Sequence, residues 1–322
     1  MISQIFLMLY ITPKLKTNPN SSSLKLLHSS TYQLLNLSTP HPMDFTLKTY
    51  KKLLQTLLDK DYHIFSFNQF ILLNSPSSPL INSSTHQLPN SPTLILRHDV
   101  DRMPQNALKM AKLEHKLGIT STYYFRTIPQ TLKPDIIKEI SDMGHEIGYH
   151  YENMAKCNGN FEMAIEDFKN NLCKLREIAP VNTICMHGSP RSRWDAKDLW
   201  KKYDYRDFGI MAEPYMDIDF NEVFYLTDTG RRWDGWKYSI RDKIQQQEKW
   251  INQGLTFHST SEIIDAIKKN KFPQKAFITT HPQRWNDNPI LWFNELFFQN
   301  IKNIVKKLLI TQNKLATKNG YS

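Results

Sequence analysis

Ionisable side chains recur in this sequence directly after short apolar runs. The first such run, residues 94–96, is followed closely by Arg97, Asp99 and Asp101. Four later apolar runs end at residues with polar, ionisable side chains: Arg126, His150, His187 and His281. Packing alone does not explain this pattern, because such residues are rarely buried unless they are paired. Carboxylates and imidazoles that converge on one point are typical of metal-assisted hydrolases.

Asp99 and Asp101 form the most informative pair. They are two residues apart in a segment expected to be extended, so both side chains should point to the same side of a strand. Two carboxylates so close repel each other unless a cation or a shared proton relieves the repulsion. One of them could ligate a metal ion while the other accepts a proton. The alternative is that the pair only caps the following helix, since Asp is a common N-cap residue.

The elements that would position these residues alternate between strand and helix patterns. Short apolar runs predict strands, and apolar residues spaced three and four apart predict helices between them. Gly118 and Gly144 should end two helices in the left-handed conformation, and a capping box from Ser259 to Glu262 should open a later one. Strands are expected at residues 94–96, 121–125, 146–150, 183–186 and 275–280, with weaker extended segments at 207–211 and 223–226. Pro289 should lead into a long terminal helix.

Repeated strand–helix units of this length imply an α/β fold with parallel strands covered by helices. A closed barrel and a doubly wound sheet both satisfy the pattern, and both place active sites at the carboxyl ends of the strands. The ionisable residues that follow the apolar runs should therefore meet. His98 and His145 alternate away from them and are expected to be buried and hydrogen-bonded.

The domain organisation is predicted from composition. Residues 1–42 are rich in Ser, Thr, Asn, Leu and Pro without a sustained period, and we interpret them as a disordered extension. Residues 43–322 are expected to form one barrel domain with an N-terminal helical segment. No apolar run approaches the ~18 residues that would cross a membrane, and no signal peptide is evident, which favours a cytoplasmic protein.

Net charge and cysteine content narrow the function classes. The 322 residues carry a net charge of +10, but residues 1–42 contain three Lys and residues 301–322 five Lys, with no acid in either segment. That leaves +2 for residues 43–300, so a groove that follows nucleic-acid phosphates is not indicated. The three cysteines lack CxxC spacing, which argues against a disulfide framework and a cysteine zinc site. Cys173 and Cys185 are expected in the core.

Three segments resemble, in order and separation, the signature segments of NodB-like polysaccharide deacetylases (carbohydrate esterase family 4). They are residues 97–101 (RHDVD), 144–150 (GHEIGYH) and 280–282 (THP). The resemblance covers residues 94–285. It implies an irregular (β/α)7 barrel that uses a divalent metal, usually zinc, to remove N-acetyl groups from amino sugars. The implied partner is a glycan or glycan precursor that contains an amino sugar.

The resemblance also implies roles for individual residues. Asp99 matches the family's catalytic base, and Asp101 matches its carboxylate metal ligand. His150 matches a histidine ligand, and His281 matches the catalytic acid.

The chain departs from the family pattern at the second histidine ligand. The family has it four residues after the first, where this sequence has Met154. We expect His187 to complete the ligand set, with Glu152 as the second choice. Residues 187–191 (HGSPR) replace the family's arginine-and-proline third motif, and the Asp/Trp fourth motif has no clear equivalent. These differences predict a divergent branch, and the alternative is a catalytically inactive relative that binds carbohydrate.

Arginine lies beside tryptophan in two predicted loops, at Arg232–Trp233 and Arg284–Trp285. An aromatic face suits a sugar ring, and a guanidinium suits a carboxylate or phosphate on a substrate. We therefore expect Arg126, Arg232, Trp233 and Trp285 to bind substrate. The alternative is that the Arg–Trp pairs only brace their loops.

Overall fold

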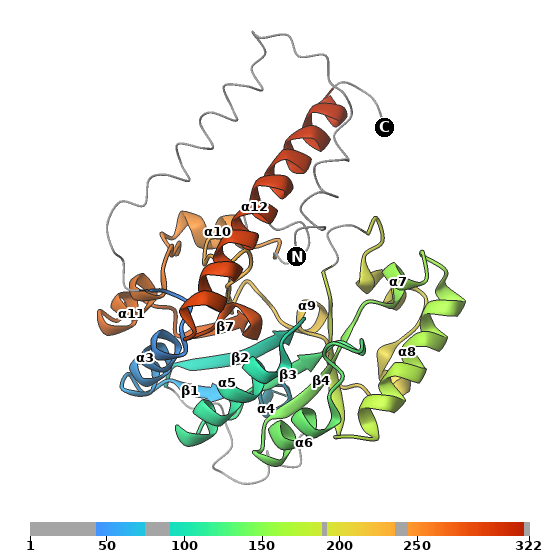
Figure 1. Cartoon of the computed structure of the whole chain (residues 1–322), viewed down its shortest axis with the longest axis horizontal. Coiled ribbons are helices and arrows are strands. Elements are labelled where there is room, and N and C mark those ends of the chain that lie inside the picture. The colour runs from blue at the N-terminus through green and yellow to red at the C-terminus, as the bar shows by residue number, and fades with distance from the viewer. Residues whose placement is uncertain (1–42, 75–90, 189–191, 236–243, 319–322) are drawn as a thin grey trace. The chain divides into compact units, whose positions relative to one another are not determined.

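The computed structural model describes residues 43–74, 91–188, 192–235 and 244–318, with side chains as far as Asn303. The predicted disordered extension, residues 1–42, lies outside them, and the domain boundary at Met43 stays a prediction. The described residues form one seven-stranded sheet with helices around it, as Figure 1 shows.

All seven strands are parallel, which confirms the predicted α/β class. They are β1 (His63–Phe65), β2 (Thr93–Val100), β3 (Thr122–Phe125), β4 (Glu146–Tyr151), β5 (Val181–Met186), β6 (Phe224–Thr227) and β7 (Lys275–Thr280). The pairing order is β5-β4-β3-β2-β7-β6, and β1 pairs with the first half of β2. Within the described residues no pairing joins β5 to β6, so the sheet is open between these strands.

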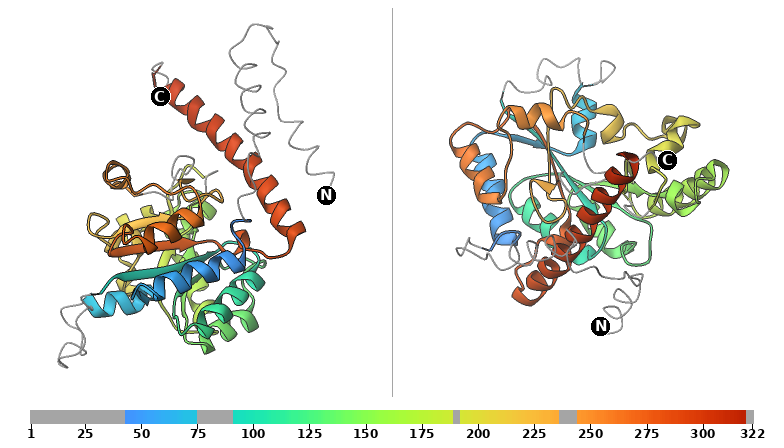
Figure 2. Two further views of the ribbon diagram at one scale, coloured as in Figure 1. Left: turned by 90° about the vertical axis from the view of Figure 1, so that its left-hand side faces the viewer. Right: turned by 90° about the horizontal axis from the view of Figure 1, so that it is seen from above.

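Helices connect the strands and cover the sheet. The longer ones are α3 (Leu47–Leu58), α4 (Phe67–Asn74), α5 (Pro104–Lys116), α6 (Pro134–Asp142), α8 (Phe161–Arg176), α11 (Thr260–Lys268) and α12 (Pro289–Lys318). Short helical segments are α7 (Asn153–Lys156), η2 (Ala196–Lys201), η3 (Tyr205–Phe208), α9 (Pro214–Asp217), α10 (Gln247–Asn252) and η5 (Pro282–Arg284). Helix α12 begins beside η5 and extends away from the sheet (Figure 2).

The predicted helix boundaries depend on local capping chemistry. Gly118 and Gly144 follow α5 and α6 with φ of +72° and +89°, a region that glycine enters without steric cost. The side chain of Ser259 accepts a hydrogen bond from the backbone N–H of Glu262 at the start of α11, which confirms the predicted cap.

Strand β2 lies at the centre of the sheet, and all eight of its residues are buried. Its apolar half packs in the core, and its polar half carries Arg97, His98 and Asp99 into the interior. Successive side chains of a strand point to opposite faces, so His98 and Asp99 enter different environments. As predicted, His98 and His145 are buried and hydrogen-bonded, to Thr280 Oγ1 (2.6 Å) and the Ala111 carbonyl (3.1 Å) respectively.

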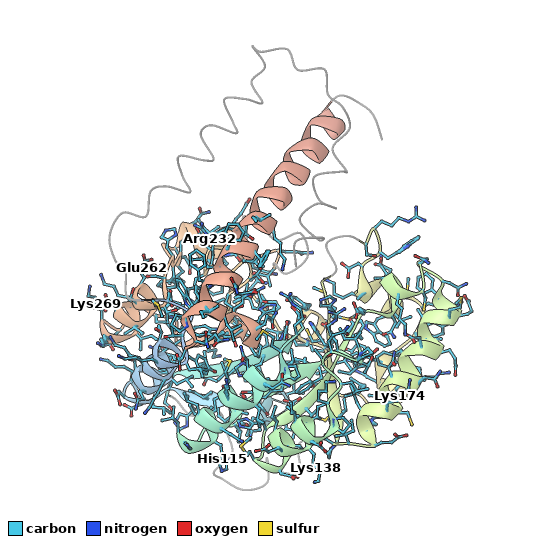
Figure 3. All side chains as sticks on the ribbon, in the orientation of Figure 1. His115, Lys138, Lys174, Arg232, Glu262 and Lys269 are labelled. Atoms are coloured by element: carbon cyan, nitrogen blue, oxygen red, sulfur yellow. The ribbon has the colours of Figure 1, made fainter. Side chains whose placement is uncertain are left out.

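Two predictions about local structure are wrong. The extended segment predicted at 207–211 overlaps the 3-10 helix η3, because the Asp204 side chain caps it by accepting from the Arg206 N–H. Cys173 is exposed on α8, whereas Cys185 is buried in β5 as predicted. Charged side chains such as Lys138 and Lys174 lie at the periphery (Figure 3). No helix among the described residues is long and apolar enough to cross a bilayer.

Candidate metal and catalytic site

The ends of four strands bring together a carboxylate and three imidazoles. Asp101 follows β2, His150 lies near the end of β4, and His187 and His281 directly follow β5 and β7. Oδ1 of Asp101 lies 3.5 Å from Nε2 of His150 and 3.4 Å from Nε2 of His187. Oδ2 of Asp101 lies 3.9 Å from Nε2 of His281. The residues predicted from their positions after apolar runs are therefore neighbours in space.

Both candidate histidine ligands are oriented through their other ring nitrogen. Nδ1 of His150 lies 3.0 Å from the carbonyl oxygen of Cys185, and Nδ1 of His187 lies 3.0 Å from Oε2 of Glu152. A carbonyl or an ionised carboxylate can only accept, so in each ring Nδ1 carries the hydrogen and Nε2 keeps its lone pair. Each lone pair is free to bind a cation beside Asp101.

Glu152 contacts a histidine and an arginine and does not join the group around Asp101. Arg126 donates to both of its carboxylate oxygens, at 2.7 and 2.9 Å, while Oε2 also accepts from His187. Burial raises the pKa of Glu152, but His187 and Arg126 lower it more strongly, to about 2. Glu152 therefore orients His187. Met154, at the position of the family's second histidine, is buried in the apolar core.

The group of Asp101, His150 and His187 fits a divalent cation. Oδ1 of Asp101 is buried and receives no hydrogen bond from the described residues. Burial raises the pKa of Asp101, but His187 and His150 hold it well below its usual value, so the group is an anion. One carboxylate and two imidazoles, with their ligand atoms within 4.8 Å of one another, match the nitrogen and oxygen donors that catalytic zinc takes. An ion held there would satisfy the orphaned oxygen.

Asp99 is held by Arg97, two residues before it on the same strand. Nε and Nη2 of Arg97 donate to the two carboxylate oxygens at 2.7 and 2.6 Å, and both side chains are buried. Burial raises the pKa of Asp99, but the guanidinium outweighs it and the pKa lies below its usual value. Asp99, His150 and Cys185 form a second group of possible ligands, but Arg97 already occupies both oxygens of Asp99.

His281 is held by Asp228, a partner whose role the sequence did not reveal. Nδ1 of His281 lies 2.6 Å from Oδ1 of Asp228, and its backbone N–H donates to Oδ2 at 3.0 Å. The indole N–H of Trp285 also donates to Oδ2, at 2.8 Å. Burial raises the pKa of Asp228, but Arg284 and His281 lower it below its usual value. The available signal was position, since Asp228 directly follows β6 as His281 follows β7.

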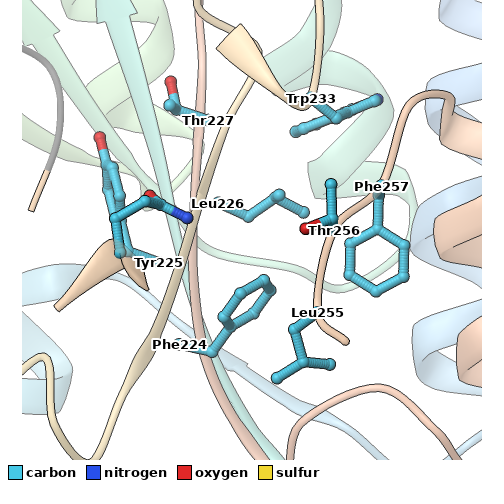
Figure 4. A pocket seen from close by; sticks show the side chains of 9 residues that line it. Phe224, Tyr225, Leu226, Thr227, Trp233, Leu255, Thr256 and Phe257 are labelled. Atoms are coloured by element: carbon cyan, nitrogen blue, oxygen red, sulfur yellow. The ribbon is translucent and has the colours of Figure 1, made fainter. Parts of the chain in front are cut away.

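The substrate-binding prediction needs correction for the two tryptophans. Trp233 and Trp285 are 2% and 0% exposed, so neither indole has an open face for a sugar ring. Trp233 donates to Thr260 Oγ1 at 2.9 Å and lines a small pocket of mainly apolar residues beside β6 (Figure 4). Arg126 is engaged with Glu152, and Arg232 pairs with Asp234 at 2.7 Å while staying partly exposed. The structure therefore favours the bracing alternative for the tryptophans.

No family model and no curated protein sequence matches the chain. Solved structures with a similar fold include wild-type BA3943 from Bacillus anthracis, described as a CE4 family pseudoenzyme, at 11% identity and a TM-score of 0.38. Others are PdaA of Bacillus subtilis, a family 4 carbohydrate esterase (12%, TM-score 0.35), and a Streptococcus mutans CE4 esterase (11%, TM-score 0.38). The matches cover 67%, 78% and 81% of this chain and 63%, 83% and 90% of the three structures.

A BA3943 mutant with restored enzymatic activity is also similar, at 11% identity and a TM-score of 0.39, covering 67% of this chain. The chain spans 65% of that mutant's length and 63% of the wild type's. The structural matches are thus to the family that the three sequence segments resemble. Since every TM-score is below 0.5, the function proposed below rests on this chain's own residues.

Proposed function

We propose that the chain is a metal-dependent hydrolase that removes an N-acyl group, most simply N-acetyl, from an amino sugar of a glycan or glycan precursor. The observation that carries the proposal is Oδ1 of Asp101, buried without a donor and facing Nε2 of His150 and His187. Zinc is the proposed ion, because catalytic zinc sites commonly use three protein ligands of this kind and leave a position open.

An ion bound by Asp101, His150 and His187 would supply Lewis acidity, polarising the amide carbonyl and bringing the pKa of water down to about 7. Asp99 is the proposed general base. Its pairing with Arg97 keeps it ionised and fixes its orientation, with Oδ2 3.8 Å from Nε2 of His150. From there it accepts the proton of the water that attacks the carbonyl carbon.

His281 is the proposed general acid. An amine is too basic to leave an amide unprotonated, so a positioned acid must donate a proton as the C–N bond breaks. The hydrogen bond from Nδ1 to Asp228 fixes the ring and stabilises its protonated form, leaving Nε2 directed toward Asp101. Asp99 and His281 then have separate roles, in which one accepts and the other donates.

The test is acetate release from an N-acetylglucosamine oligomer by the zinc-loaded protein. Asp99→Asn and His281→Ala should each lower turnover by about 10²–10⁴-fold with zinc content nearly unchanged. His115→Ala, an exposed histidine on α5, is the matched control and should keep full activity. Undiminished release by either site variant would remove that residue from its role.

The alternative is a catalytically inactive relative that binds carbohydrate, and Met154 in place of the family's second histidine favours it. The pairing of Asp99 with Arg97 and of His281 with Asp228 favours catalysis, because simple binding needs neither a base nor an acid. A wild-type protein that binds the oligomer and zinc yet releases no acetate would establish the alternative. The cytoplasmic location stays a prediction.

A further inference from the structure

Helix α12 presents an apolar face outward. Ile290, Phe293 and Phe297 are spaced three and four residues apart, so they share one face of the helix. They are 72%, 61% and 50% exposed, and Leu291 and Phe298 beside them are also exposed. In a surface helix of a globular protein the apolar stripe normally faces the core. We call these five residues the outer face of α12.

The opposite side of α12 is polar and attached to the domain. Asn303 donates to the carbonyl of Gly230 at 2.9 Å, and Gln299 donates to Asn303 at 2.9 Å, both side chains being buried. The indole of Trp292 donates to the carbonyl of Asp44 at 2.6 Å. Turning the outer face inward would break these hydrogen bonds. The described contacts therefore fix the rotation of the helix about its axis.

The chain that follows the outer face is strongly basic. Residues 301–322 contain five Lys and no Asp or Glu. An apolar face rich in Phe, combined with nearby lysines, is the chemistry of helices that lie in the interface of an anionic bilayer. Two copies pairing through α12 would instead bring ten lysines together without a single acid from these segments, which is unfavourable. Charge complementarity thus favours an anionic partner.

We propose that the outer face of α12 docks on the surface of a membrane that contains anionic lipids. The phenyl rings enter the boundary between headgroups and acyl chains, and the lysines are attracted by the headgroup charge. The proposal is independent of the catalytic site, because none of the five residues belongs to it.

The test is co-sedimentation of the full chain with vesicles of phosphatidylcholine and phosphatidylglycerol in equal parts. The wild type should bind these vesicles, bind pure phosphatidylcholine more weakly, and lose binding as salt is raised. Phe293→Asp should lower the partition constant by about tenfold or more. Met163→Asp is the matched control, because Met163 on α8 is also 61% exposed and gains the same charge; it should bind as the wild type does.

Three results would overturn the proposal. They are a wild type that does not bind the mixed vesicles, equal binding by Phe293→Asp, and a dimer in light scattering that Phe293→Asp dissociates. The last would assign the outer face to a second copy of this chain. Should Phe293→Asp fail to give a native circular dichroism spectrum, Phe297→Ser serves as the second variant, with the same expected loss of binding.

Discussion

Two buried clusters in this molecule have the same composition, one carboxylate and two histidines, yet differ in how the carboxylate is satisfied. One contains Asp101 with His150 and His187. The other contains Glu114 of α5 with His98 and His145. Adjacent residues of β2 lead to the two clusters, since His98 points to one face of the sheet and Asp99 to the other.

Both oxygens of Glu114 have donors. Oε1 accepts from Tyr50 Oη at 2.6 Å, and Oε2 accepts from Ser121 Oγ at 2.6 Å and Tyr123 Oη at 2.9 Å. Nε2 of His98 lies 3.0 Å from Oε1. Oδ1 of Asp101, by contrast, has no donor among the described residues. The comparison teaches that the neighbouring donors, and not the residue types, separate a structural carboxylate from one suited to a cation.

The largest expected difference is in metal binding. Asp101→Asn should lower zinc affinity and acetate release by more than the about 10–100-fold that loss of an outer-shell partner costs. Glu114→Gln, the same isosteric change in the other cluster, should keep one zinc per folded chain. Metal analysis after dialysis and the acetate assay measure both. Full zinc content in Asp101→Asn would show that the two clusters do not differ in this way.

The next effect concerns stability and runs in the opposite direction. Glu114→Gln should lower the free energy of unfolding by about 3 kcal/mol, because buried hydroxyl and imidazole donors lose a charged acceptor. Asp101→Asn in the metal-free protein should change it by less than about 1 kcal/mol, since Oδ1 has no hydrogen bond to lose. Urea unfolding in the presence of a chelator measures both variants. Equal destabilisation would contradict the comparison.

The pH dependence of stability sharpens the same point. Burial raises the pKa of Glu114, but His98, His145 and the Ser121 hydroxyl lower it more strongly, from 4.5 to about 2. Because the folded-state pKa is depressed, Glu114 contributes stability that is present above about pH 4.5 and is lost as the pH falls toward 2. At about 1.4 kcal/mol per pKa unit this loss reaches about 3 kcal/mol.

The measurement is the free energy of unfolding between about pH 6 and pH 3. Glu114→Gln should flatten the acid limb of the wild-type curve by this contribution, because the titrating group is gone. An acid limb identical in the variant and the wild type would assign the loss to other groups.

The smallest expected effect tests the outer support of the Asp101 cluster. Glu152→Gln should weaken zinc binding by about 10–100-fold, since the carboxylate that orients His187 loses its charge and its pair with Arg126. Competition with a chromophoric chelator measures the affinity. Glu166→Gln, the same substitution at an exposed glutamate on α8, is the control and should leave zinc affinity unchanged.

Position after an apolar run was a good guide to the candidate site. It selected Asp101, His150, His187 and His281, whose side chains the structure brings within 3.4–3.9 Å of one another through Asp101. The rule works because the carboxyl ends of parallel strands meet at the same edge of a sheet. Their roles in binding metal and in catalysis stay predictions.

The partners of these residues could not be predicted in the same way. Asp228 and His281 are 53 residues apart in the chain, and Tyr50 and Glu114 are 64 apart. No local period relates such pairs. The burial of Trp233 and Trp285 was missed for the same reason, because Phe45, from a distant part of the chain, packs against both rings.

The sequence by itself determined the order of strands and helices and the residues that stand at the strand ends, because both depend on periods of two and of about 3.6 residues within a short window. Only the tertiary structure decided which carboxylate receives donors and which faces two imidazole lone pairs. Hydrogen-bond satisfaction depends on side chains that come from elements distant in sequence, and Glu114 and Asp101 differ in that respect alone.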